Sequence, residues 1–230
     1  MDTLALLANR QSLRIYDDRP VPLDVRRAVL EAAISAPTAG ALMLYAIIEI
    51  EEEALKAELA VTCDNQPFIA KAPWVALFAA DYQRLYDGWR IQGKTPSRKP
   101  GAGDLLLACD DALIAAQTAV IAAEAMGLGS CYIGDIMENA ERHQAMLKLP
   151  DYVFPAVLLC FGYPPEGYTR KKVPRLPLEA VLHTNEYHTK PTAGGDHAQL
   201  LIDRSFSKYE APFSVEMTRS MERWLERWKG

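Results

Sequence analysis

The chain has 230 residues, of which 50% are hydrophobic, so it can bury the core of one complete domain. It carries 25 basic and 30 acidic residues, a net charge of -5, without a long basic run, which argues against a nucleic-acid-binding surface. Its 4 cysteines form no C-x-x-C pair and its 4 histidines lack metal-ligand spacing. No signal-peptide pattern is present, and no apolar stretch reaches about 18 residues without charge. We expect a cytoplasmic protein of a reducing compartment, with no metal site and no membrane association.

Hydrophobic periodicity predicts the elements of the first half of the chain. A short helix begins near Thr3, with Leu4, Leu7 and Ala8 on its apolar face. The next elements, in chain order, are a helix that starts at Pro22 and stops at Pro37, a strand over 45–51, a helix over 52–61 and a strand over 74–80. Residues 82–99 are aromatic, basic and polar, and they run into a loop of turn-forming residues.

The second half begins with an alanine-rich helix over 104–126, which is apolar almost all round and should be buried on most sides. Gly127 and Gly129 end it. The elements predicted after it are a strand over 130–133, a helix over 139–147, a central strand over 153–162, a linker over 190–195 and a helix over 213–228. This order of helices and strands favours α/β or α+β layers around one sheet.

Arg10, Ser12 and Arg14 stand at alternate positions directly after the first helix. Alternate side chains of an extended segment project to one side, so two guanidinium groups and a hydroxyl can meet one anion. A phosphate requires that combination of bidentate charged donors and a small hydroxyl. Arg-x-Ser-x-Arg alone is also typical of a solvated turn.

Further motifs follow in a definite order: Ala36-Pro37-Thr38-Ala39-Gly40, Asn65-Gln66-Pro67-Phe68, Gly127-Leu128-Gly129-Ser130-Cys131, Ile133-Gly134, Phe161-Gly162-Tyr163-Pro164 and Pro174-Arg175-Leu176-Pro177. Together with Arg10 to Arg14, this series resembles the nitroreductase family of FMN-dependent oxidoreductases over roughly residues 3–182. The remaining C-terminal residues lie outside the resemblance.

The resemblance implies a three-layer α+β fold, with a central, mainly antiparallel sheet flanked by helices, in an intertwined homodimer. Residues 1–185 would form the FMN-binding domain, and residues 186–230 a C-terminal extension that docks on the same or the partner subunit. The helix over 104–126 would pack against its mate. The implied reaction is ping-pong hydride transfer from NADH or NADPH, through flavin N5, to a nitroaromatic, a quinone or another small electron-poor acceptor. The flavin carries this chemistry, so no catalytic side chain is expected.

The resemblance also assigns the cofactor-binding residues at the phosphate end of FMN. Arg10, Ser12 and Arg175 would hold the phosphate. Arg14 would reach the ribityl chain or the N1/C2=O edge of the ring, where a cation favours the reduced flavin. Lys171 and Lys172 could assist in binding the phosphate, although a solvated loop accounts for them better.

At the ring end, the backbone amides of Ile133 and Gly134 would face flavin N5 and O4. Asn65, with Gln66 beside it, would lie at the pyrimidine edge, or would simply form a turn before Pro67. Pro37, Thr38 and Ala39 match a loop that reaches across the dimer to the partner's flavin. Here the chain departs from the family, which often has asparagine where this chain has Ala41, so we expect a more apolar pocket.

Two other functions remain open. A reductive dehalogenase or flavin-consuming enzyme of the same fold could use residues 82–99 as a lid over its substrate. A non-catalytic flavin-binding dimer could use the helix over 213–228 to bind a partner. Asp110 and Asp111 do not suggest a catalytic carboxylate pair, because adjacent helical residues point about 100° apart.

Overall fold

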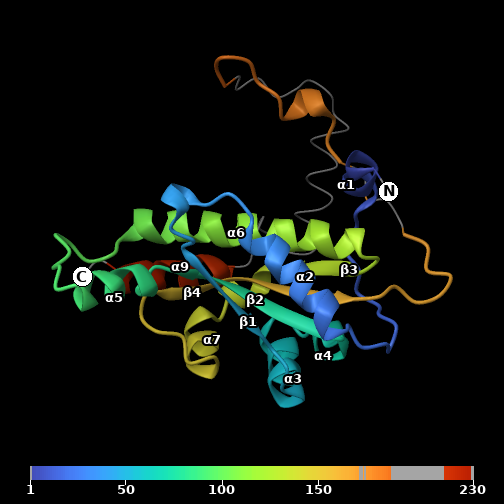
Figure 1. Ribbon diagram of the computed structural model, residues 1–230, viewed down its shortest axis with the longest axis horizontal. Coiled ribbons are helices and arrows are strands. Elements are labelled where there is room, and N and C mark those ends of the chain that lie inside the picture. Colours follow the sequence, from blue (N-terminus) through green and yellow to red (C-terminus); the bar gives the residue numbers. More distant parts are fainter. Residues whose placement is uncertain (1, 171–172, 174, 188–214, 229–230) are drawn as a thin grey trace. The chain divides into compact units, whose positions relative to one another are not determined.

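The computed structural model describes residues 2–170, 173, 175–187 and 215–228 (Figure 1). The chain divides into two compact units, which we call the main unit (residues 1–170 and 216–230) and the second unit (residues 171–215). In the second unit, the described residues include one short 3₁₀ turn, η3 (Leu178–Ala180). The predicted linker over 190–195, together with Lys171 and Lys172, lies outside the described residues.

The main unit is built on one antiparallel sheet. Its strands, in spatial order, are β1 (Tyr45–Glu49), β2 (Trp74–Asp81), β4 (Val153–Gly162) and β3 (Gly129–Ile133). Every pair of neighbouring strands is antiparallel. The expected α+β class is therefore confirmed and the α/β alternative excluded. β1 and β3 form the two edges of the sheet.

The two central strands are buried along their whole length, which explains their uninterrupted apolar sequences. Along β2, Trp74 and Phe78 face one hydrophobic cluster, whereas Val75 and Leu77 face another, as the two-residue period of a strand requires. The register between β2 and β4 shifts where Pro155 lies opposite Ala79. Proline has no N–H for the ladder, so a bulge at this position is expected.

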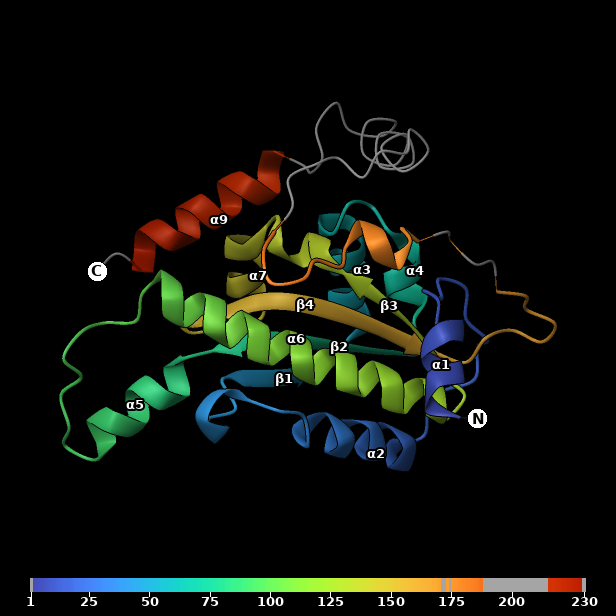
Figure 2. The same ribbon diagram turned by 90° about the horizontal axis from the view of Figure 1, so that it is seen from above.

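Helices cover both faces of this sheet (Figures 1 and 2). One side holds α6 (Ala102–Ala125), with α2 (Leu23–Ile34) packed against it. The other side holds α3 (Glu53–Thr62), α4 (Pro67–Lys71), α7 (Ala140–Met146) and the 3₁₀ turn η2 (Gly134–Met137). The last helix, α9 (Val215–Trp228), buries Trp224 on the α6 side, where its ring lies 5.1 Å from that of Phe154. Trp224 therefore packs on the core of its own subunit.

The first helix, α1 (Thr3–Asn9), has the predicted position but not the predicted buried face. Leu6 is buried, while Leu4 and Leu7 are 74% and 43% exposed. In a helix of only 7 residues, the contact with α6 determines which side is buried, and the leucine spacing does not. Two helices were not predicted: α4, and α5 (Gln83–Ile91), which occupies the first part of the aromatic and polar stretch. Residues 92–101 form the expected loop.

The long helix α6 is confirmed, and Gly127, at φ 81°, ends it. The expected burial on most sides is wrong for one face, where Leu106, Leu107, Leu113 and Ile114 are 41–65% exposed. By length and composition alone α6 could span a membrane. Its opposite face, which includes Ala108, Ala112 and Ala116, is fully buried, as in the core helix of a globular domain.

Candidate functional site

Residues 10–14 lie extended beside the edge strand β3. Ser12 forms a parallel bridge with Ser130, and the Leu13 N–H donates to the Ser130 carbonyl at 2.8 Å. The Leu13 side chain is buried against Gly129, where an added Cβ would lie only 2.5 Å from Leu13 Cδ2. Because Leu13 points into the core, its neighbours Ser12 and Arg14 project from the opposite side of the segment.

Arg10, Ser12 and Arg14 all influence the buried thiol of Cys131 on β3. Burial raises the pKa of this thiol, and Arg14, Ser12 and Arg10 oppose the rise. All three residues therefore lie on the side of the segment that faces Cys131 of the neighbouring strand. The structure thus brings together the three residues whose spacing suggested an anion site.

Arg10 carries an unsatisfied donor. Its Nη1 atom is buried and has no hydrogen-bond partner among the described residues. Nearby Glu124 is ion-paired with Arg170 at 2.7 Å. Burial raises the pKa of Glu124, while Arg170 and Arg10 both oppose that rise. Arg10 and Arg170 thus both act on one carboxylate, and Arg10 Nη1 and Glu124 Oε1 are both buried without a partner among the described residues. An anionic oxygen would satisfy the Arg10 N–H.

A cavity of about 760 Å³ opens next to Arg14. Phe68 lines it, with the Arg14 guanidinium 6.0 Å from the centre of its ring. The wall carries charges of both signs: Lys71, Asp18 and the pair of Lys56 with Glu53 at 2.7 Å. Its size falls within the range of small-molecule sites, and its aromatic wall suits a flat ligand.

The predicted ring-binding residues lie at the end of the same strand. Ile133 ends β3 and Gly134 begins η2. The Gln66 side chain donates to Asp135 of η2 and to the Cys63 carbonyl, both at 2.9 Å. Asn65 precedes Gln66 in this turn and adopts the left-handed conformation at φ 50°. The bond to Asp135 ties the turn to the segment that follows Ile133.

A buried histidine, His143, makes hydrogen bonds to the elements around this region, although the sequence indicated no role for it. His143 Nδ1 donates to the Ile136 carbonyl at 2.7 Å, and Nε2 lies 2.8 Å from the Thr62 hydroxyl. Burial lowers the pKa of His143, which favours the neutral ring. These hydrogen bonds join α3, η2 and α7.

Pro37, Thr38 and Ala39 lie elsewhere, in the loop before β1. Asp111 of α6, only 2% exposed, accepts hydrogen bonds from the Thr38 hydroxyl, from the Ala39 N–H at 2.9 Å and from the Leu44 N–H at 3.1 Å. Asp111 thus anchors the loop. This role of Asp111 was not predicted from the sequence, although a carboxylate within a largely apolar helix was a visible signal.

The candidate residues therefore form two groups at opposite edges of the sheet. The residues at the β3 edge are Arg10, Ser12, Arg14, Ile133 and Gly134, with Asn65 held near them. The loop with Pro37, Thr38 and Ala39 precedes β1, which is three strand spacings away, or about 14 Å. Arg175 belongs to the second unit and is exposed there.

Comparison with known proteins agrees with this architecture. Residues 7–163 match the model of the nitroreductase family. An oxygen-insensitive NADPH nitroreductase of Salmonella typhimurium is 36% identical over 185 residues, which cover 80% of this chain and 74% of that protein. An FMN reductase (NADPH) of Bacillus subtilis is 32% identical over 209 residues, which cover 90% of this chain and 83% of that protein.

A solved structure of a hypothetical oxidoreductase from Bacillus subtilis has a TM-score of 0.84 and 28% identity to this chain, with 97% of this chain and 98% of that one covered. The fold, the ordered motifs and the sequence identities agree, and they confirm the predicted family. The chain belongs to the nitroreductase family.

Proposed function

We propose that this protein is an FMN-dependent oxidoreductase that takes hydride from NADH or NADPH and passes it to a nitroaromatic, a quinone or a similar small electron-poor acceptor. One observation carries the proposal: Arg10 Nη1 is buried without a partner among the described residues, and Arg10 belongs to the extended segment beside β3 that also carries Ser12 and Arg14, as a phosphate-binding site requires. The names of the two relatives, a nitroreductase and an FMN reductase, support the reaction class.

The residues at the β3 edge fit FMN chemically. Arg10 and Ser12 would hold the phosphate, and the role of Arg175 in binding it stays a prediction. Arg14 would bind the ribityl chain or the N1/C2=O edge of the ring. The cavity next to Arg14 and Phe68 offers room for part of the cofactor.

Bound FMN would supply the two-electron chemistry, which none of the protein side chains can perform alone. The protein would orient and tune the cofactor. The Arg14 cation would stabilise negative charge at the N1/C2=O edge, and the backbone at Ile133 and Gly134 would fix the position of N5 and O4.

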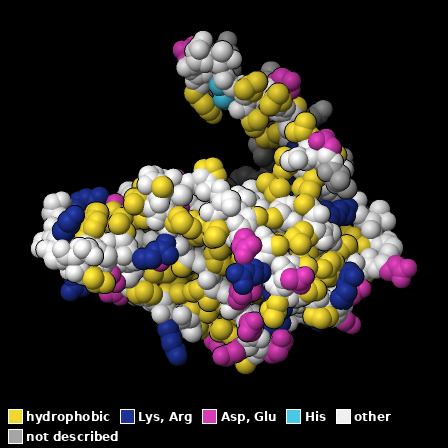
Figure 3. Space-filling model, viewed as in Figure 1, with side chains coloured by type: hydrophobic (Ala, Val, Ile, Leu, Met, Phe, Trp, Pro, Cys, Tyr) yellow, Lys and Arg dark blue, Asp and Glu magenta, His cyan; other side chains and the backbone are white. Residues whose placement is uncertain are grey.

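We further propose that two subunits share each site. The Pro37–Ala39 loop and the Arg10 cluster lie at opposite edges of one sheet, which favours a loop that serves the flavin of a second copy. The exposed face of α6, with Leu106, Leu107, Leu113 and Ile114, offers an apolar surface for that copy. Figure 3 shows broad hydrophobic areas between charged groups on the face that carries α2 and α6.

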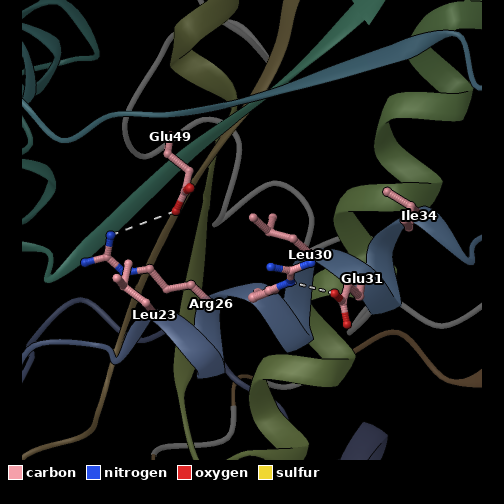
Figure 4. Close-up of a pocket in the computed structure, with 7 residues that line it drawn as sticks. Leu23, Arg26, Leu30, Glu31, Ile34 and Glu49 are labelled. Atoms are coloured by element: carbon pink, nitrogen blue, oxygen red, sulfur yellow. Dashed lines mark hydrogen bonds and ion pairs between the residues drawn. The ribbon is translucent and has the colours of Figure 1, made fainter.

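A groove next to β1 also supports an intertwined dimer. Among the described strands, β1 pairs only with β2, so its outer edge can accept another strand. Beside this edge lies a cavity of about 560 Å³, lined by Leu30 and Ile34 of α2 and by Glu49 of β1 (Figure 4). A segment of the second copy is the occupant that we propose for this groove.

The loop before β1 indicates the kind of acceptor. Ala41 and Leu42 are exposed on it, where the family often has a polar asparagine at position 41. A pocket without hydrogen-bond partners cannot offset the desolvation of polar groups. We therefore expect flat, apolar acceptors to be reduced more efficiently than small polar ones.

The absorption spectrum of the purified protein, recorded anaerobically with FMN before and after addition of NADH or NADPH, tests the proposed function. The proposal predicts a protein-bound flavin band that bleaches with at least one nicotinamide and recovers when a quinone is added. A protein that binds no FMN would overturn it. A bound flavin that neither nicotinamide reduces would instead favour the non-catalytic flavin-binding dimer.

A further inference from the structure

The loop over residues 38–44 adopts a strained backbone conformation. Gly40, Ala41 and Met43 all have φ values of 51–57°, in the left-handed region. Glycine reaches this region without penalty, but in alanine and methionine the Cβ atom crowds the following carbonyl. Such a conformation persists only where the surrounding structure enforces it.

Asp111 supplies one set of enforcing contacts. Its Oδ1 atom accepts from the Ala39 N–H, and its Oδ2 atom accepts from the Thr38 hydroxyl and the Leu44 N–H. Thr38 Oγ1 in turn accepts from the Met43 N–H at 2.8 Å. The start and the end of the loop are thus tied to one buried carboxylate. Only a group that accepts at both oxygens can make all of these bonds.

Arg84 of α5 supplies the other set. Its Nη2 atom donates to the Met43 carbonyl and, at 3.2 Å, to the Tyr45 carbonyl. The backbone N–H of Arg84 donates to Asp81 Oδ1 at 3.0 Å, and this bond fixes the start of α5 at the end of β2. Two N–H groups of the loop, those of Ala39 and Leu44, are therefore held by α6, and the Met43 carbonyl is held by α5.

We propose that Asp111 is a positioning residue: it holds the strained 38–44 loop in the one conformation that presents Pro37–Ala39 to the flavin of the partner subunit. Arg84 is the second anchor of the same loop. This inference rests on the proposed function, because it assigns the loop to a flavin site. Neither residue touches the cofactor in this account, and both act through the loop backbone.

The test compares Asp111→Asn with Asp151→Asn, which neutralises an exposed carboxylate in the turn before β4, outside the loop contacts. In Asp111→Asn, an amide N–H₂ group faces the N–H donors of the loop. FMN titration should show a dissociation constant raised at least about tenfold and an altered absorption spectrum of the bound flavin, both unchanged in Asp151→Asn. Amide hydrogen exchange at Ala39, Met43 and Leu44 should become faster.

Arg84→Met provides a milder variant in case Asp111→Asn folds poorly, and Arg90→Met on the same helix is its control. We expect Arg84→Met to raise the FMN dissociation constant roughly two- to tenfold and to speed exchange at Leu44. A purely structural role for Asp111 would lower the melting temperature but leave FMN affinity and the bound-flavin spectrum unchanged, and that result would overturn the proposal.

The exchange measurement separates this proposal from the proposed function. If the wild-type protein binds no FMN, the proposed function fails and the flavin-positioning role fails with it, while exchange in the apo protein still reports whether Asp111 holds the loop. If the wild type binds FMN and exchange at the loop is unaffected by Asp111→Asn, only the positioning role is refuted.

Discussion

The two edges of the sheet hold candidate residues in opposite ways. At the β3 edge, the buried Arg10 Nη1 atom has no partner among the described residues. At the β1 edge, Asp111 and Arg84 bind the donors and acceptors of the 38–44 loop. The first region therefore has the character of a site that a ligand completes, and the second that of a preorganised element.

Arg10→Ala should have the largest effect, because it removes the donor that the proposed phosphate would satisfy. A charge-assisted hydrogen bond contributes about 1.5–3 kcal/mol, so FMN affinity should fall roughly tenfold to a hundredfold. Arg142→Ala is the control, since Arg142 lies exposed on α7 and pairs with Glu58 at 2.9 Å. Equal FMN affinity of Arg10→Ala and wild type in a titration would remove the phosphate site from this account.

Gly129→Ala should disturb the β3 edge without changing any charge. The new Cβ would lie 2.5 Å from Leu13 Cδ2 and 2.8 Å from Leu13 Cβ, so the segment carrying Ser12 must shift. We expect urea denaturation to show a loss of about 1–3 kcal/mol, with weaker FMN binding.

Gly88→Ala in α5 is the matched control, because an added Cβ there meets nothing within 4 Å. It should be neutral or stabilising by up to about 1 kcal/mol. If Gly129→Ala behaved like Gly88→Ala, the close packing of Leu13 on β3 would not position the Arg10 cluster.

His143 should make the stability of the main unit depend on pH. Burial lowers its pKa below the usual 6.5, so near and below that pH the unfolded chain binds a proton that the folded protein does not. The contribution is complete above pH 6.5 and is lost as the pH falls through the folded pKa. Urea denaturation at pH 7.5 and 5.5 should therefore show a larger loss in the wild type than in His143→Phe. Equal losses would mean that other groups cause the pH dependence.

Ala41→Gly should have the smallest effect, and it should be stabilising. Position 41 has φ 57°, which glycine adopts without the steric cost that alanine pays, so the melting temperature should rise by the equivalent of about 0.5–1 kcal/mol. Ala28→Gly, at an exposed position inside α2, should instead destabilise by about the same amount. A fall in stability in both variants would show that the loop is not strained at position 41.

The difference between the two edges of the sheet also explains which features could be predicted from the sequence. The strands, α6 and the Arg10–Arg14 cluster follow from short-range patterns: apolar runs, alanine periodicity and alternate projection in an extended segment. The anchors of the 38–44 loop come from side chains 41 to 73 residues away in the chain, and no local pattern indicates such pairs. α5 was not predicted because its helical face is aromatic and charged. The buried face of α1 was predicted wrongly because the contact with α6 determines which side is buried.

Complementation between subunits tests the central claim, that one site uses the β3 edge of one subunit and the loop of another. A mixed dimer of Arg10→Ala and Asp111→Asn subunits, isolated with two affinity tags and titrated with FMN, would contain one site with both defects and one with neither. The account predicts that half of the sites in this dimer bind FMN with wild-type affinity, although each parent variant binds weakly. Absence of any tight site would mean that both groups serve a flavin within one subunit, which would contradict the account.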